Sequence, residues 1–176
     1  MTPLSYFSFA WRILLRDRLY SIAYGSVASV LFLLFFISVR LHFHLFGSIS
    51  LSSIVSFEQS PQILFYTSLS SIASLFFFHT LHRIGDIGVM MAVGGNRIGC
   101  IWLHTLALFC LFLPSAVLGV VSSYFLIDLN PTHLGKEALA FFSGFAFLIL
   151  FGFLISIPTV GLTTFTDPYK SIRRQK

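Results

Sequence analysis

Histidines are the side chains of this sequence whose type and spacing could bind a metal or a haem. His42 and His44 lie two residues apart, and His79 and His82 lie three residues apart. Residues at i and i+3 share one face of a helix, so the second pair could present two imidazoles to one ligand. Neither pair has a cysteine or carboxylate within three residues. Metal or haem efflux is therefore one hypothesis, and rings satisfied by water or lipid are the alternative. His104, which stands alone, is predicted to form a hydrogen bond between helices.

No other set of residues indicates catalysis. The acidic residues are scattered over terminal or loop positions, and no close pair could act as general acid and base: Asp17, Glu58, Asp86, Asp128, Glu137 and Asp167. The phosphate-binding pattern G-x-x-x-x-G-K-[ST] is absent from the sequence. We therefore expect a chain that is not an enzyme, binds no cofactor itself, and needs a partner for any ATP-driven activity.

The composition indicates an integral membrane protein. Of 176 residues, 56% are apolar and 10% are charged, whereas about 25% of the residues in an average soluble protein are charged. An aromatic content of 17% also excludes a disordered chain. The basic residues lie at the ends of apolar runs and not on one polar face, which argues against nucleic-acid binding and is typical of membrane spans.

Four apolar runs are long enough to cross a bilayer, whose hydrocarbon core of about 30 Å needs about 20 helical residues. The predicted spans are 19–40, 61–82, 98–127 and 138–166, in a single membrane domain 1–176. The first run is too long for the apolar part of a cleaved signal peptide, so we interpret it as a retained span. The outer loops 41–60 and 128–137 are too short to fold into a substrate-binding domain.

The basic residues also predict the orientation. Nine lie on the side of the two termini (Arg12, Arg16, Arg18, Arg83, Arg97, Lys170, Arg173, Arg174 and Lys176) and two on the other side (Arg40 and Lys136). Because positive residues are enriched in cytoplasmic segments, both termini and the basic tail 167–176 are predicted to be cytoplasmic.

Residues 1–18 have the pattern of an amphipathic helix. Apolar and polar side chains follow two stripes at helical spacing: Leu4, Phe7, Trp11 and Leu14 in one, and Ser5, Ser8, Arg12 and Arg16 in the other. We expect this helix to lie in the cytoplasmic interface, anchored by Trp11, Arg12 and Arg16. The alternative is that it merely extends the first span into water.

The segment 83–97, between the second and third spans, combines charge, apolar residues and glycines. Ile84, Ile87 and Met91 would form one ridge on a short helix parallel to the membrane. Gly85 and Gly88 would let another surface approach the backbone closely. Spacing alone leaves open an ordinary cytoplasmic hairpin with turn glycines.

Two motifs resemble those of a known family. The run Arg83-x-x-Asp86-Ile87-Gly88-Val89-x-x-Ala92-x-Gly94 resembles the signature R-x-x-E-I-G-[IV]-L-R-A-[IL]-G of FtsX-like ABC transporter permeases, the group that includes MacB and LolC. Asp86 stands where the family prefers Glu, and Met91 replaces a common Arg. The run Asp167-Pro168-Tyr169-Lys170-Ser171-Ile172-Arg173 is similar to the D-P-x-x-[AS]-[LI]-R that follows the last span of these permeases. The chain would be a minimal form, since it lacks their large extracytoplasmic domain.

The resemblance implies a permease subunit of the bacterial inner membrane. Segment 83–97 would be a cytoplasmic coupling helix that contacts a separate ABC ATP-binding subunit, where ATP and Mg would be bound. The coupling contact would involve Arg83, Gly85, Asp86, Ile87, Gly88, Val89, Met90, Ala92 and Gly94. A C-terminal contact would involve Asp167, Pro168 and Arg173.

The family also implies partners and a mode of action. A second permease chain would complete a homodimer or heterodimer, and a periplasmic or lipoprotein partner is compatible with the topology. Such complexes drive efflux, lipid or lipoprotein extraction, or mechanotransmission. A noncatalytic scaffold that regulates cell-division or cell-wall machinery is the alternative from another class.

Overall fold

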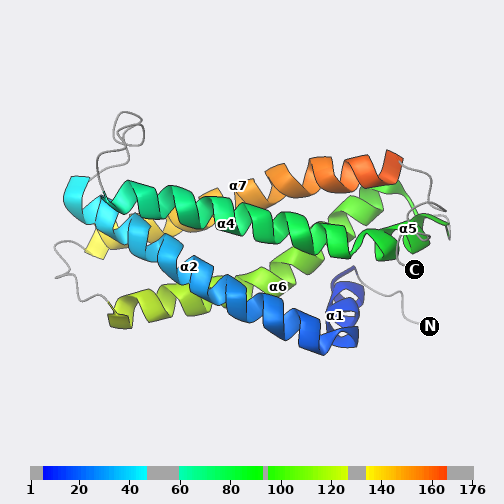
Figure 1. Cartoon of the computed structure of the whole chain (residues 1–176), viewed down its shortest axis with the longest axis horizontal. Coiled ribbons are helices and arrows are strands. Elements are labelled where there is room, and N and C mark those ends of the chain that lie inside the picture. Colours follow the sequence, from blue (N-terminus) through cyan, green and yellow to red (C-terminus); the bar gives the residue numbers. More distant parts are fainter. Residues whose placement is uncertain (1–5, 47–59, 93–94, 127–133, 166–176) are drawn as a thin grey trace.

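Every regular element that the structure describes is a helix (Figure 1). The computed structural model describes residues 6–46, 60–92, 95–126 and 134–165 of the chain. The helices in these ranges are α1 (Tyr6–Arg16), α2 (Arg18–Phe46), α4 (Ser60–His82), α5 (Ile84–Ala92), α6 (Arg97–Leu126) and α7 (Leu134–Phe165). The all-helical class predicted from the sequence is therefore confirmed for the described residues.

Three of these helices are long and apolar enough to cross a bilayer. The candidate spans are Arg18–Leu45 in α2, Gln62–His82 in α4 and Ile98–Leu126 in α6, and they are the mark of a membrane protein. In α7 the described apolar stretch is shorter, Phe141–Ile155. The fourth span therefore stays a prediction.

Helix α2 forms the centre of the bundle and contacts α4, α6 and α7. Its Phe32, Phe35 and Phe36 are almost fully buried, and Ile72 of α4 is fully buried in the same apolar cluster. The rings of Phe76 in α4 and Phe112 in α6 extend this cluster with centroids 4.6 Å apart. Aromatic side chains from three helices thus hold the bundle together through contact area and ring packing.

Small residues let α6 approach α2 closely. Ser115, Gly119 and Ser123 recur every four residues along α6 and are buried against α2. A Cβ atom at Gly119 would lie 2.8 Å from both the backbone nitrogen of Leu33 and the Cβ of Phe32. No side chain larger than glycine fits there without moving a backbone, as is common where membrane helices meet through small residues.

The α2 helix continues beyond its predicted end. It runs to Phe46, so the first six residues of the outer loop predicted at 41–60 are helical. Arg40, which appeared to end the span, is 4% exposed; its Nη1 donates to the carbonyl oxygen of Ser123 at 2.6 Å. Its guanidinium also lies over the ring of Tyr124, 4.5 Å from the centroid. The bundle buries this guanidinium against a carbonyl oxygen and an aromatic ring, so the helix does not have to end where the charge occurs.

The second outer loop is also shorter than predicted, because α7 begins at Leu134 and not after residue 137. Residues 134–137 include Lys and Glu. Their charges indicated the end of a membrane span, but both residue types also favour helix, so the helix begins before the apolar run. The rest of this loop, 128–133, lies outside the described residues, as do most of the first loop, 47–59, and residue 127 of the predicted third span.

Helix α1 is a separate element that folds back onto α6 (Figure 1). The chain turns at Asp17, between the end of α1 and the start of α2. Ala10 of α1 is fully buried with Leu103 and Ala107 of α6. For the described residues 6–16, the alternative that this segment simply extends the first span is therefore wrong. Figure 1 shows α1, α5 and the C-terminal end of α7 at the same end of the molecule.

Candidate functional site

Four charged residues, which we call the ion network, join α1 and α2 to α4 and α5. They are Arg16 and Asp17, at the turn between α1 and α2, and Arg83 and Asp86, at the start of α5. Nη1 of Arg83 donates to Oδ2 of Asp17 at 2.7 Å and to Oδ2 of Asp86 at 3.0 Å. Nη2 of Arg16 donates to the two carboxylate oxygens of Asp86 at 2.8 and 3.1 Å. Two residues of the motif in segment 83–97, Arg83 and Asp86, thus bind the amino-terminal part of their own chain.

The ion network is most buried at Arg83, whose side chain is 5% exposed, and most open at Arg16, which is 61% exposed. A buried guanidinium is tolerated only where acidic groups and hydrogen bonds compensate it. Burial alone would raise the pKa of Asp86, but the hydrogen bonds from Arg16 and Arg83 outweigh it, so the pKa lies below its usual value. The hydrogen bond to Asp86 is the main reason that the pKa of Arg16 is raised. Both pKa shifts favour the charged form of the residue concerned. The formal charges of the two arginines and the two aspartates in the ion network cancel.

Aromatic and histidine rings pack beside Arg83. The Tyr20 ring of α2 lies 5.6 Å from the Arg83 guanidinium and stacks on His82 with centroids 4.0 Å apart. The His79 ring lies 5.7 Å from that of Tyr20. The predicted histidine pair of α4 is therefore engaged in ring packing, and the described residues contain no group of three or more His, Cys, Asp or Glu that could hold a metal.

His104 of α6 acts as the sequence predicts. It is 4% exposed, and its Nε2 lies 3.0 Å from Oγ1 of Thr80 in α4. Close by, a cavity of about 20 Å³ is lined by His79, His104 and Arg83, among others. A space of this size holds one water molecule. The prediction of a buried interhelical hydrogen bond is confirmed.

Helix α5 has a buried face and an exposed face. Gly85, Ile87 and Gly88 are buried, and Ile87 packs against Cys100 of α6. The expectation that Ile87 supplies contact to a partner is therefore corrected, because its own chain already covers it. Val89 is 50% exposed, and Ala92 is exposed at the end of the helix. Val89 is thus a large apolar side chain of the motif that the fold leaves exposed.

A glycine that the motif did not single out ends α5. The backbone N–H of Gly95 donates to the carbonyl of Met90 at 2.9 Å, and a Cβ atom at Gly95 would lie 2.7 Å from that oxygen. Only glycine permits this close turn. The motif residue Gly94 itself lies outside the described residues.

The other predicted site residues are placed in part. Trp11 is 48% exposed and Arg12 is exposed on α1, as anchors in a membrane interface would be. The predicted C-terminal contact, Asp167, Pro168 and Arg173, lies outside the described residues. Sequence reasoning missed Asp17 as a partner of Arg83; the opposite charges were its only signal.

No family model, curated protein or solved structure matches this chain. Its function must therefore be argued from its own residues and their arrangement.

Proposed function

We propose that this chain is the membrane subunit of an ABC transporter of the FtsX, MacB and LolC type. One observation carries the proposal: the segment that resembles the coupling signature forms a short helix between two candidate spans, and two signature residues tie it to the amino-terminal helices. In this proposal α5 contacts a separate ATP-binding subunit, which binds ATP and Mg. A second permease chain completes the complex in the bacterial inner membrane.

The ion network suggests how such a contact would transmit motion. Arg83 lies at the joint between α4 and α5, and its partner Asp17 lies at the joint between α1 and α2. Arg16 links α1 to Asp86 within α5. A displacement of α5 by an ATP-binding subunit would therefore move the ends of α4 and α2 together. Relayed along the spans, this motion would act on the outer side of the membrane.

Val89 would supply the apolar part of the contact with the ATP-binding subunit. It is half exposed, whereas its neighbours Ile87 and Gly88 are buried by their own chain, so a partner would meet the side chain of Val89 and not the backbone at Gly88. Apolar residues at the centre of an interface carry much of the binding energy. Arg83 and Asp86 would set the position of α5 from inside the chain.

Co-purification tests the proposal. The chain is tagged at its C-terminus, extracted from its native membrane in mild detergent, and the proteins that accompany it are identified. We expect a stoichiometric ABC ATP-binding subunit, and at least a tenfold loss of it in Val89→Glu. Phe125→Glu is the matched control, because Phe125 is 86% exposed and lies near the C-terminal end of α6, far along the chain from α5.

One result would contradict the permease function, and another would contradict the contact proposed for α5. The first is the absence of any ATP-binding subunit under conditions that preserve other ABC complexes, which would favour the scaffold function. The second is undiminished co-purification with Val89→Glu, which would exclude the exposed face of α5 as the contact.

A further inference from the structure

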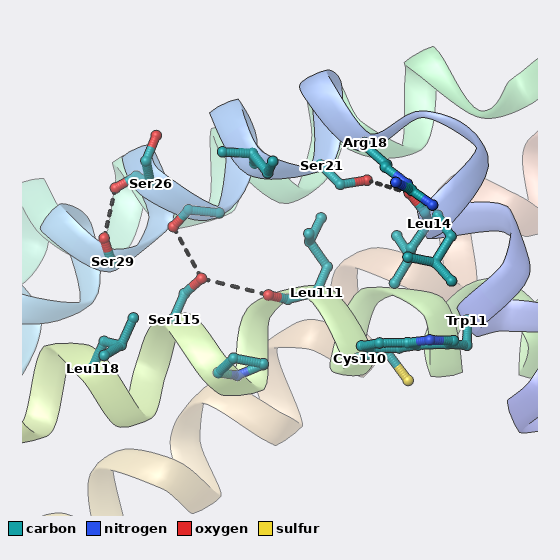
Figure 2. A pocket seen from close by; sticks show the side chains of 14 residues that line it. Trp11, Leu14, Arg18, Ser21, Ser26, Ser29, Cys110, Leu111, Ser115 and Leu118 are labelled. Atoms are coloured by element: carbon teal, nitrogen blue, oxygen red, sulfur yellow. Dashed lines mark hydrogen bonds between the residues drawn. The ribbon is translucent and has the colours of Figure 1, made fainter.

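A lateral groove runs between α1, α2 and α6 (Figure 2), and none of the four residues of the ion network lines it. Its volume is about 670 Å³, within the range of sites that hold small ligands. Trp11 and Leu15 contribute to it from α1, Arg18 and Ile22 from α2, and Leu118 from α6. Its walls thus come from one candidate interfacial helix and two candidate spans.

The interior of the groove suits an apolar occupant. Although several serines line it, each hydroxyl donates to a backbone carbonyl of the chain itself: Ser21 to Leu14, Ser26 to Ala23, Ser29 to Ser26 and Ser115 to Gly25. These hydroxyl protons are therefore already used, and a polar ligand would find no free hydroxyl donor on this wall. A hydrocarbon chain loses nothing in such surroundings.

One end of the groove has a different character. Figure 2 shows Trp11 and Arg18 together at the end nearest α1, with Ser29 and Leu118 at the other end. Arg18 is exposed, and the described part of the chain offers it no acidic partner, whereas Arg16 and Arg83 are both paired. Arginine binds phosphate oxygens strongly, and tryptophan prefers the headgroup level of a bilayer.

The length of the groove matches one leaflet. Arg18 and Ser29 are eleven residues apart on α2, which at 1.5 Å per residue is about 16 Å. Half of a hydrocarbon core of about 30 Å is about 15 Å. An acyl chain that begins at Arg18 would therefore end near the middle of the bilayer.

From these observations we propose that the lateral groove is a binding site for an anionic phospholipid. One acyl chain lies along α2 and α6, the anionic headgroup binds Arg18, and Trp11 packs at the level of the headgroup. The site does not depend on the proposed transport function.

Tryptophan fluorescence can test the site, because the chain contains two tryptophans. Trp102→Phe leaves Trp11 as the reporter within the groove. Trp11→Phe leaves Trp102, which is 60% exposed on α6 and outside the groove, as the reporter of general lipid contact. Each full-length variant is reconstituted into bilayers that contain either brominated phosphatidylglycerol or brominated phosphatidylcholine, and quenching is measured against lipid fraction.

We expect about a fivefold preference for phosphatidylglycerol at Trp11, which is the effect of about one basic residue at a membrane surface, and no preference at Trp102. Arg18→Gln should abolish the preference. Arg12→Gln should retain it, since Arg12 has the same charge on α1 but does not line the groove. Ser29→Phe, which fills the groove, should reduce quenching of Trp11 by both lipids.

Three results would overturn the site. Equal quenching of Trp11 by the two lipids would indicate only nonspecific lipid contact. Protection of Trp11 from both lipids would indicate that protein, such as a second copy of the chain, covers the groove. A preference that survives Arg18→Gln would show that this guanidinium does not bind the headgroup.

Discussion

The interface between α2 and α6 and the ion network hold helices together by opposite means. At Gly119 the two backbones approach so closely that shape alone determines the packing. At Arg83 the elements are held by two carboxylates that lie on different helices or turns. The first contact should therefore be sensitive to volume and insensitive to charge, and the second should show the reverse.

The largest effect should come from removing both carboxylates of the ion network. Asp17→Asn with Asp86→Asn leaves the Arg83 guanidinium buried without a counter-charge, and we expect a loss of about 3 kcal/mol in stability. Thermal unfolding of the purified protein in detergent measures it. Adding Arg83→Met should restore most of the loss, because an apolar side chain of similar size needs no counter-charge. A double variant as stable as the wild type would refute the structural role of the network.

Substitution of two glycines, one in the α2–α6 interface and one outside it, tests whether this interface depends on side-chain volume. Gly119→Ala should lower stability by about 2 kcal/mol, because its Cβ atom overlaps the backbone of α2. Gly135→Ala on α7 is the matched control: a Cβ there meets nothing within 4 Å, so the better helix propensity of alanine should stabilise slightly. Equal effects in the two variants, measured by thermal unfolding, would contradict the close contact.

Acid should weaken the ion network and leave the glycine contact unchanged. The pKa of Asp86 is lower in the folded chain than its usual value, through its hydrogen bonds with Arg16 and Arg83. Its contribution to stability is therefore complete above about pH 4 and is lost as the pH falls through the folded pKa. Asp86→Asn should show a shallower loss of stability below pH 4 than the wild type, whereas Gly119→Ala should keep the wild-type slope. Identical slopes for all three proteins would show that Asp86 does not contribute.

The smallest effect should come from Arg16→Gln, since an exposed ion pair contributes at most about 1 kcal/mol. In 1 M salt, where the screening length is about 3 Å, this loss should vanish. Ser115→Ala, which removes the hydrogen bond to the carbonyl of Gly25, should cost about 1 kcal/mol at any salt concentration. Thermal unfolding of both variants is compared at low and at 1 M salt. A loss of stability that depends on salt in Ser115→Ala, or one that does not in Arg16→Gln, would contradict this difference.

The sequence predicted the features that depend on neighbouring residues. Apolar runs between charges located α2, α4 and α6, because crossing a bilayer needs a continuous apolar helix. The stripe of α1 indicated its amphipathic character, but no local pattern could show that Ala10 packs against α6. The end of the first span was predicted too early, at Arg40, for the same reason: the groups that contact this side chain lie on another helix.

The candidate site could be predicted only in part. Arg83 and Asp86 stood out through a motif, whereas their partners Asp17 and Arg16 lie 66 and 70 residues away along the chain. Nothing in one sequence links charges at such a separation. The sequence also could not predict which face of α5 is buried, because both Ile87 and Val89 are apolar and only the tertiary packing distinguishes them.

The separation of Asp17 from Arg83 also orders events during synthesis. At about 5 to 20 residues per second, the ribosome adds Arg83 several seconds after Asp17. During that interval we expect α2 to lack its later partners α4 and α6, and Asp17, just before the start of α2, to be without Arg83. The pairing of the two residues is therefore a late step of membrane assembly, and it becomes available only when α4 has been delivered beside α2.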